Sequence, residues 1–310
     1  MSGLVWLASY PKSGSTWFRM LVSNLLTVGE RGADINEPDE RTSITSSRTS
    51  FEDVTLLDSE MLTADETDIL RPRVFEAIAS GDYANPATRP WANRPDWPAL
   101  MKVHDAYTLT PEGEPLLAAA QGAVLIVRDP RGVAPSFAHH VGCSIDRAID
   151  LMASEETAFG ELPGRPSPQI RQKLLSWGAH AASWLEQTDL PIHLVRYEDL
   201  KADTPGAFLE AMHFAGRKIT RGEAERAARL AAFDRLQQQE RANGFREWPG
   251  RRGFHTFFRR GEAEGWRQEL SPEQIARIQA IHGPMMRRLG YPAEPATEAH
   301  GLGAGTDVWV

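Results

Sequence analysis

A loop near the N-terminus of the chain has the residue types of an anion-binding site. The apolar run Leu4 to Ala8 leads into this loop, which holds one lysine among small residues: Ser9-Tyr10-Pro11-Lys12-Ser13-Gly14-Ser15-Thr16-Trp17. Apolar residues at helical spacing follow it. The first N–H groups of a helix lack partners within the helix, and the helix dipole adds partial positive charge there. The sequence therefore predicts that a phosphate group binds at this turn without a metal ion.

The position of the lysine separates this loop from the common nucleotide-binding loop. In GxxxxGK[ST] the lysine follows the last glycine, whereas Lys12 precedes Gly14. A P-loop phosphotransferase also uses the hydroxyl residue beside that lysine to hold Mg²⁺. A kinase-like phosphotransferase is therefore kept only as an alternative, together with a strand-to-helix turn that serves packing alone.

Polar residues also come at the ends of three other apolar runs. The four runs and their polar residues are Leu4–Ala8 before Lys12, Leu100–Val103 with Lys102 and His104, Ala123–Val127 before Arg128, and Ile192–Val195 before Tyr197. We predict that these runs are strands. The helices predicted between and after them lie at 15–28, 134–153, 169–187, 204–215, 221–239 and 272–288.

This alternation predicts an α/β fold with a central parallel sheet flanked by helices. Ligands of such sheets bind beyond the carboxyl ends of the strands. We therefore expect the polar residues at the strand ends to meet at one edge.

Size and charge limit the class of protein. The chain has 310 residues, of which 41% are hydrophobic, enough to bury a substantial core. We expect one domain over residues 1–292 and a flexible C-terminal tail over 293–310, where Pro, Gly and Ala are prominent. The formal net charge of −8 argues against a nucleic acid as partner.

Several sequence patterns are missing. Cys143 is the only cysteine, which rules out an internal disulfide. No run approaches 18 apolar residues and the N-terminus lacks a signal-peptide pattern, so we predict a cytoplasmic protein with no membrane span. The absence of a cysteine cluster and of an HExxH motif predicts that there is no metal site.

Five motifs, in order along the chain, resemble those of the cytosolic-type sulfotransferases. They are Tyr10 to Trp17, Lys102-Val103-His104, Val127-Arg128-Asp129-Pro130-Arg131 with Ser136, Arg196-Tyr197-Glu198-Asp199-Leu200, and Arg259-Arg260-Gly261 followed by Trp266. The resemblance runs from about residue 4 to 290 and implies a P-loop-like sulfotransferase fold. It also implies transfer of the sulfuryl group from 3′-phosphoadenosine 5′-phosphosulfate (PAPS) to an acceptor hydroxyl, with release of 3′-phosphoadenosine 5′-phosphate (PAP).

The resemblance assigns residues to the donor. Its 5′ end is assigned to the loop residues Lys12, Ser13, Gly14, Ser15, Thr16 and Trp17. Its 3′-phosphate is assigned to Arg128, Ser136, Arg259, Arg260 and Gly261. Its adenine is assigned to Trp17, Tyr197 and Phe233. Two cationic clusters suit PAPS, because its negative charge lies at two separate places.

The catalytic residues implied by the resemblance are His104, Lys12 and Lys102. A histidine of near-neutral pKa can take the proton of an attacking hydroxyl group, and His104 matches the family's KxH position. Lys102 is implied to neutralise a sulfuryl oxygen, and Lys12 the bridging oxygen as the S–O bond breaks. A non-catalytic nucleotide-binding relative is the other alternative, and the presence of both Lys102 and His104 argues against it. His139 and His140 match no catalytic position and are expected to be structural.

The chain departs from the family pattern at three places. Glu264-Gly265-Trp266 stands where Gly-Asp-Trp is usual, and Ala231-Ala232 replaces a Thr-Ser pair ahead of Phe233. We therefore expect one polar contact to adenine to be missing. Pro272 and Ala276 interrupt the family's dimerisation motif, so the family's dimer cannot be assumed.

The sequence does not identify the acceptor, which can be a small molecule, a peptide or a glycan. Its pocket is expected to come from the loops 31–60, 81–98, 142–168 and 241–256. Aromatic residues in these loops favour an apolar or aromatic hydroxyl compound: Trp91, Trp97, Phe245 and Trp248. Arginines near the last loop favour an anionic glycan or peptide: those at 241, 246, 251, 252, 259 and 260.

Overall fold

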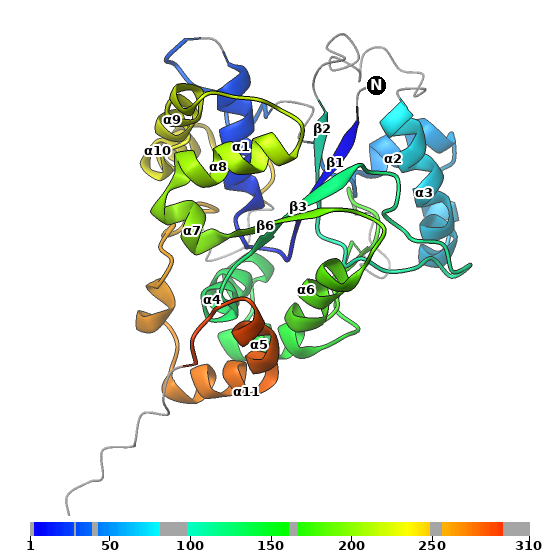
Figure 1. The fold of residues 1–310 in the computed structure, drawn as a ribbon. Helices are drawn as coiled ribbons and strands as arrows, with labels where there is room; N and C mark the ends of the chain where they lie inside the picture. The colour runs from blue at the N-terminus through cyan, green and yellow to red at the C-terminus, as the bar shows by residue number, and fades with distance from the viewer. Residues whose placement is uncertain are drawn as a thin grey trace, which may run out of the picture.

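A four-stranded parallel sheet forms the centre of the fold in the computed structural model (Figure 1). The structure describes residues 3–27, 29–38, 43–80, 98–160, 167–248 and 256–293. The strands are β1 (Leu4–Ser9), β2 (Ala99–Val103), β3 (Gly122–Val127) and β6 (Ile192–Arg196), in the order β2-β1-β3-β6. All three pairings are parallel. The predicted α/β fold with a central parallel sheet is therefore confirmed.

Helices flank this sheet (Figure 1). They are α1 (Ser15–Leu26), α2 (Arg48–Thr55), α3 (Ala64–Ser80), α4 (Pro130–Val141), α5 (Ile145–Ala153), α6 (Trp177–Glu186), α7 (Tyr197–Ala202), α8 (Thr204–Phe214), α9 (Arg221–Leu230), α10 (Phe233–Asn243) and α11 (Pro272–Arg288). Shorter elements are the 3₁₀ turns η2 (Ser59–Met61) and η5 (Gly265–Gln268), and the antiparallel pair β4 (Ala158–Phe159) and β5 (Gln172–Lys173).

The sheet lies between two hydrophobic cores. Side chains along β1 alternate between its faces. On one face Trp6 meets Phe75 of α3 edge-on, with ring centroids 5.1 Å apart, in a cluster that also takes in α4, α5, α6 and α11. On the other face Val5 and Leu7 pack in a cluster with Phe18 of α1 and with α8 and α9. Burial on both faces explains why the strands appear as uninterrupted apolar runs in the sequence.

Three of the predicted helices are wrong in extent. The predicted helix 134–153 is two helices, because Gly142 ends α4 in the left-handed region at φ 73°. The predicted helix 221–239 is interrupted at Ala231 and Ala232, between α9 and α10. Only the second half of 169–187 is helical, since part of the first half forms β5.

The last predicted helix, 272–288, coincides with α11. Ser271 is its N-cap, and Gln274 completes a capping box with it. Pro272 occupies the first turn, where its missing N–H costs nothing.

Some predictions fall on residues outside the described ranges. Apart from Pro98 at the end of the loop and Ala293 at the start of the tail, the loop 81–98 and the tail 293–310 lie there, so the predictions for Trp91, Trp97 and the tail stay predictions. Among the residues that are described, no helix is long and apolar enough to cross a membrane. The same residues contain no group of three or more side chains that could hold a metal ion.

Candidate functional site

The loop between β1 and α1 is a compact turn that only certain residues can make. Lys12 has a φ of 69° and Gly14 one of 111°. A Cβ atom on Gly14 would lie 2.8 Å from Cδ2 of Tyr197, so only glycine fits against that ring. Gly14 is also the N-cap of α1 and has no side chain to bond the first N–H groups of the helix. Those N–H groups are available to an anionic ligand.

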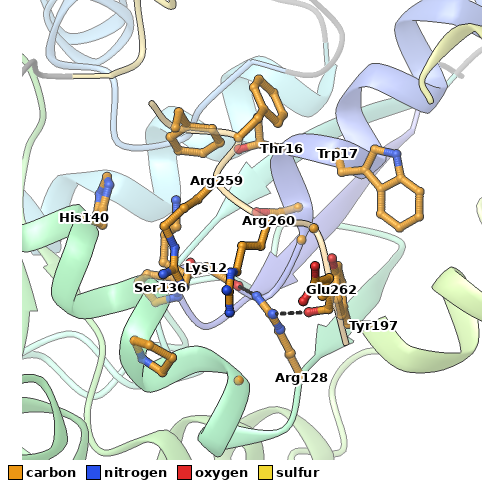
Figure 2. Close-up of a pocket in the computed structure, with 18 of the residues that line it drawn as sticks. Lys12, Thr16, Trp17, Arg128, Ser136, His140, Tyr197, Arg259, Arg260 and Glu262 are labelled. Atoms are coloured by element: carbon orange, nitrogen blue, oxygen red, sulfur yellow. Dashed lines mark hydrogen bonds between the residues drawn. The ribbon is translucent and has the colours of Figure 1, made fainter. Parts of the chain in front are cut away.

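This loop lines a pocket at the carboxyl end of the sheet (Figure 2). The lining includes nearly every residue predicted for the donor and for catalysis: Lys12, Gly14, Ser15, Thr16, Trp17, Lys102, His104, Arg128, Ser136, Tyr197, Phe233, Arg259, Arg260 and Gly261. Ser13 is the exception, since it is fully buried within the loop and does not line the pocket. The four strands therefore bring their terminal polar residues to one place.

Lys12 is a buried cation among other cations. Its ammonium group lies 3.6 Å from the centre of the Phe257 ring. Burial lowers the pKa of Lys12 to about 7, and the positive charges of Lys102 and Arg128 act in the same direction. A bound anion would stabilise the charged form of Lys12 and raise its pKa.

Lys102 reaches the same pocket from β2. Burial lowers the pKa of Lys102 to about 8, while the carboxylate of Glu247 acts against that shift. The two groups are 3.9 Å apart, measured from Nζ to Oε2. Oε1 of Glu247 accepts a hydrogen bond from Arg19 at 2.6 Å. Lys102 thus belongs to a row of alternating charges that ends in the buried Arg19.

His104, which follows β2, is held as a neutral imidazole. Its Nδ1–H donates to the backbone oxygen of Ser9 at 2.6 Å, a pairing that fixes the tautomer because a carbonyl can only accept. Burial, together with the charge of Lys102, holds the pKa of His104 well below its usual value. Its backbone oxygen accepts a hydrogen bond from Nε2 of His180 at 3.1 Å. Nε2 of His104 therefore carries a lone pair at neutral pH and can accept a proton.

Arg128, Arg259 and Arg260 gather beside Lys12 and Ser136, as Figure 2 shows. Arg128 donates to the backbone oxygens of Lys12 and Glu262, at 3.2 and 2.9 Å. Its guanidinium also lies 4.4 Å from the centre of the Tyr197 ring. These contacts fix Arg128 between the loop and the segment that carries the other two arginines.

Arg259 and Arg260 share a carboxylate. Both terminal nitrogens of Arg259 donate to Glu269, one of them at 2.9 Å, and Nη1 of Arg260 lies 3.5 Å from the same side chain. A guanidinium fork binds phosphate with the same geometry that it uses for carboxylate. The pair is thus already arranged to hold an anion with two oxygens.

Aromatic side chains line the pocket between its charged groups. Nε1 of Trp17 donates to the backbone oxygen of Ala231 at 3.0 Å, and the Trp17 ring meets Tyr197 edge-on. Gly261 has a φ of 66°, and a Cβ atom there would lie 2.5 Å from the Phe233 ring. Any larger residue would therefore push Phe233 out of place. These rings form a slot suited to a planar base.

Some lining residues carry no motif that assigns them to a site. Five of them are His140, Lys201, Glu247, Phe257 and Glu269. Of these five, Lys201 alone has a sequence signal, since it lies one helical turn after Tyr197 on α7. His140 lines the pocket although it was expected to be structural only.

The predicted acceptor loops contribute unequally. Ile44, Phe159 and Glu247 line the pocket, each from a different one of the four loops, and the remaining loop lies outside the described residues. Phe245 is instead buried in the core against Phe257. Of the predicted aromatic residues in the described ranges, neither Phe245 nor Trp248 lines the pocket.

Comparison with known proteins identifies the family and the relatives of this chain. A model of the sulfotransferase domain matches residues 3–290. Cytosolic sulfotransferase 17 of Arabidopsis thaliana is 24% identical over 302 residues, which cover 92% of this chain and 75% of the relative. The amine sulfotransferase of Oryctolagus cuniculus is 23% identical over 289 residues, covering 91% and 80%.

Solved structures share the fold at low sequence identity. A retinol dehydratase in complex with androsterone and the inactive cofactor PAP superposes with a TM-score of 0.53 at 19% identity, covering 91% of this chain and 80% of that one. A mouse sulfotransferase complexed with PAP gives 0.54 at 18% identity, covering 93% and 84%. The similarity establishes the overall arrangement of sheet and helices.

Proposed function

This chain belongs to the sulfotransferase domain family, and on that premise we propose that it transfers the sulfuryl group of PAPS to an acceptor hydroxyl and releases PAP. The observation that carries this proposal is a pocket with two groups of cations and an aromatic slot. Lys12 and Lys102 form one group, and Arg128, Arg259 and Arg260 form the other. PAPS needs both, because its sulfuryl end and its 3′-phosphate are separate anions.

The loop and the arginines would hold the donor from its two ends. The 5′-phosphate sits at the N-terminus of α1, and Arg259 with Arg260 holds the 3′-phosphate. Trp17, Tyr197 and Phe233 enclose the adenine. The two solved structures named above contain PAP, which supports the same ligand here. The name of the Arabidopsis relative also supports the predicted cytoplasmic location.

His104 acts as the general base. Its Nε2 takes the proton of the acceptor hydroxyl while that oxygen forms a bond to sulfur. The bond between sulfur and the bridging oxygen breaks, and its electron pair goes to the bridging oxygen of PAP. Lys12 stabilises the charge that develops on this oxygen, and Lys102 neutralises a sulfuryl oxygen. The fixed Nδ1 hydrogen bond to Ser9 keeps Nε2 as the acceptor throughout.

The two alternatives have less support. A kinase-like phosphotransferase would need the lysine after the last glycine of the loop, and Lys12 comes before it. A non-catalytic relative would not require His104 and Lys102, and both residues line this pocket. Neither alternative is favoured by a specific contact.

Transfer can be tested with isotope-labelled PAPS. The purified protein is incubated with [³⁵S]PAPS, excess EDTA and a panel of neutral and charged alcohols and phenols. We expect PAP to form only when an acceptor is present, with label in the acceptor. Phosphorylation of any of these compounds from ATP and Mg²⁺, without label transfer from PAPS, would contradict the proposal.

The affinity for PAP is expected to fall as the pH rises from 7 to 9. The free protein loses a proton from Lys12 near pH 7 and from Lys102 near pH 8, whereas the bound phosphate favours their charged forms. Binding at pH 8 should therefore take up about one proton. Calorimetry in two buffers of different ionisation enthalpy measures this uptake. Lys12→Arg should reduce it, because arginine stays charged. A pH-independent affinity with no uptake would be inconsistent with the buried lysines as ligands.

Replacing Glu269 with glutamine is expected to tighten PAP binding roughly tenfold. The carboxylate competes with the 3′-phosphate for the fork of Arg259, and an amide competes far less. Binding of adenosine 5′-phosphate, which lacks the 3′-phosphate, should not change. Glu264→Gln is the matched control, since that exposed carboxylate bonds Arg267 instead. Weaker PAP binding by Glu269→Gln would mean that Glu269 positions Arg259 rather than competing for it.

A further inference from the structure

One part of the pocket is left over after the donor and catalytic residues are assigned. It is lined by Ile44, His140, Phe159, Gln169, Glu247 and Phe257, which we call the acceptor end. The ring of His140 contacts those of Phe159 and Phe257, with centroids 6.1 and 6.4 Å apart. Four of these six residues have an aliphatic or aromatic side chain: Ile44, His140, Phe159 and Phe257. The acceptor end is therefore built for a compact apolar body.

Glu247 is the one carboxylate among these six residues. Its Oε1 accepts the hydrogen bond from Arg19, but its Oε2 is 3.9 Å from Lys102, which is too long for a hydrogen bond. Within the described residues no other donor bonds to Oε2. The side chain of Glu247 is 25% exposed. The carboxylate thus offers the pocket an oxygen with an unused lone pair.

Glu247 is charged at neutral pH. Burial acts to raise the pKa of this carboxyl, but the positive charges of Lys102 and Arg19 outweigh that effect and lower it. Only a cationic or hydrogen-bonding partner would satisfy its second oxygen without cost.

Of the six arginines that favoured an anionic acceptor, the four in the described ranges lie elsewhere, and Arg251 and Arg252 fall outside those ranges. Arg241 and Arg246 are exposed and do not line the pocket. Arg259 and Arg260 are paired with Glu269 and are the proposed ligands of the 3′-phosphate. The two lysines nearest the acceptor end are required by the sulfuryl group of the donor. Among the described residues, Glu247 is thus the charged side chain of the acceptor end.

We propose that Glu247 selects acceptors that carry a protonated amine next to an apolar ring, and that it disfavours anionic acceptors. This inference rests on the proposed sulfuryl transfer. The ammonium group would donate to Oε2 of Glu247 while the ring lies against Phe159 and Phe257. The hydroxyl would then point to His104, which lines the same pocket. A carboxylate or sulfate on the acceptor would instead face the charge of Glu247.

Three phenols with short para side chains of different charge test this selection. They are tyramine, 4-ethylphenol and 3-(4-hydroxyphenyl)propionate, which carry a cation, no charge and an anion. PAP release from PAPS gives kcat/KM for each. A hydrogen bond to a charged group predicts a preference for tyramine over 4-ethylphenol of roughly 10- to 100-fold. The anionic phenol should be the poorest acceptor.

Glu247→Gln should bring the ratio of tyramine to 4-ethylphenol close to one. Its amide oxygen can still accept from Arg19, which keeps that buried guanidinium paired. Because the ratio is taken within one variant, any change in turnover that is common to both phenols cancels. Glu262→Gln is the matched control, since Glu262 lines the pocket beside Arg128, and its ratio should equal that of the wild type.

The possible outcomes separate this inference from the proposed function. If the protein turned over the anionic or the neutral phenol in preference to tyramine, the proposed role of Glu247 would be overturned. Sulfuryl transfer itself would still stand. Normal PAP binding with no turnover of any of the three phenols would also overturn the inference, because the predicted class is then not accepted. Failure to bind PAP at all would overturn the proposed function and this inference with it.

Discussion

Turnover of the His104→Ala variant is expected to fall roughly 10²- to 10⁴-fold, with its affinity for PAP unchanged. The imidazole is the group that takes the proton from the acceptor hydroxyl, and alanine leaves only water for that task. PAP makes no hydrogen bond to this base in the proposed mechanism, so binding should be preserved. Steady-state kinetics with PAPS and calorimetry with PAP measure the two quantities.

Two controls distinguish a lost base from a disturbed fold. Added imidazole should restore part of the activity of His104→Ala, because a small base can enter the space that the side chain leaves. His193→Ala, on β6 against Phe214, removes a histidine outside the pocket and should leave turnover near the wild-type level. If His104→Ala turned over at the wild-type rate, another group would be the base.

Replacing Arg259 with alanine is expected to weaken PAP binding roughly 10²- to 10³-fold. Its fork would give the 3′-phosphate two charge-assisted hydrogen bonds, the geometry that it now uses for Glu269. Adenosine 5′-phosphate lacks that phosphate and should bind the variant as well as it binds the wild type. The difference between the two ligands isolates the contribution of the 3′-phosphate.

The double variant Arg259→Ala/Glu269→Gln controls for the carboxylate that loses its partner. It removes the unpaired charge of Glu269, so any remaining loss of PAP affinity belongs to the arginine. Calorimetric titration of each variant with both nucleotides provides the data. Equal losses for PAP and adenosine 5′-phosphate would show that Arg259 supports the pocket in general and does not bind the 3′-phosphate.

The sheet and the strand ends could be predicted from the sequence because buried parallel strands are continuous apolar runs. All four predicted strands agree with the structure to within one residue at either end. The convergence of Lys12, His104, Arg128 and Tyr197 then follows from the parallel topology, since all carboxyl ends lie at one edge. Backbone geometry adds to this, as Gly14 shows by fitting against Tyr197.

Helix ends were harder to predict, for reasons that apolar spacing does not contain. The end of α4 depends on the left-handed backbone of Gly142. The break between α9 and α10 falls at two alanines, which favour a helix by propensity, so tertiary packing overrides that preference there. α3 was not predicted, and its buried Asp68 and Arg71 interrupt the apolar stripe by which a helix is recognised.

The acidic residues of the pocket could not be predicted at all. Glu247 lies in a turn after α10, and Glu269 follows η5. Neither has a fixed spacing to a motif that would place its carboxylate against a particular cation. Each is brought to the pocket by long-range packing, which joins Glu247 to Arg19 of α1 across more than two hundred residues.

The most direct test of the donor site is calorimetric titration of the metal-free protein with PAP, and in a second experiment with ATP and Mg²⁺. Two cationic clusters on one pocket predict micromolar or tighter binding of PAP and much weaker binding of ATP. If ATP with Mg²⁺ binds and PAP does not, the result contradicts the sulfotransferase mechanism. The Lys12 loop would then be that of a phosphotransferase.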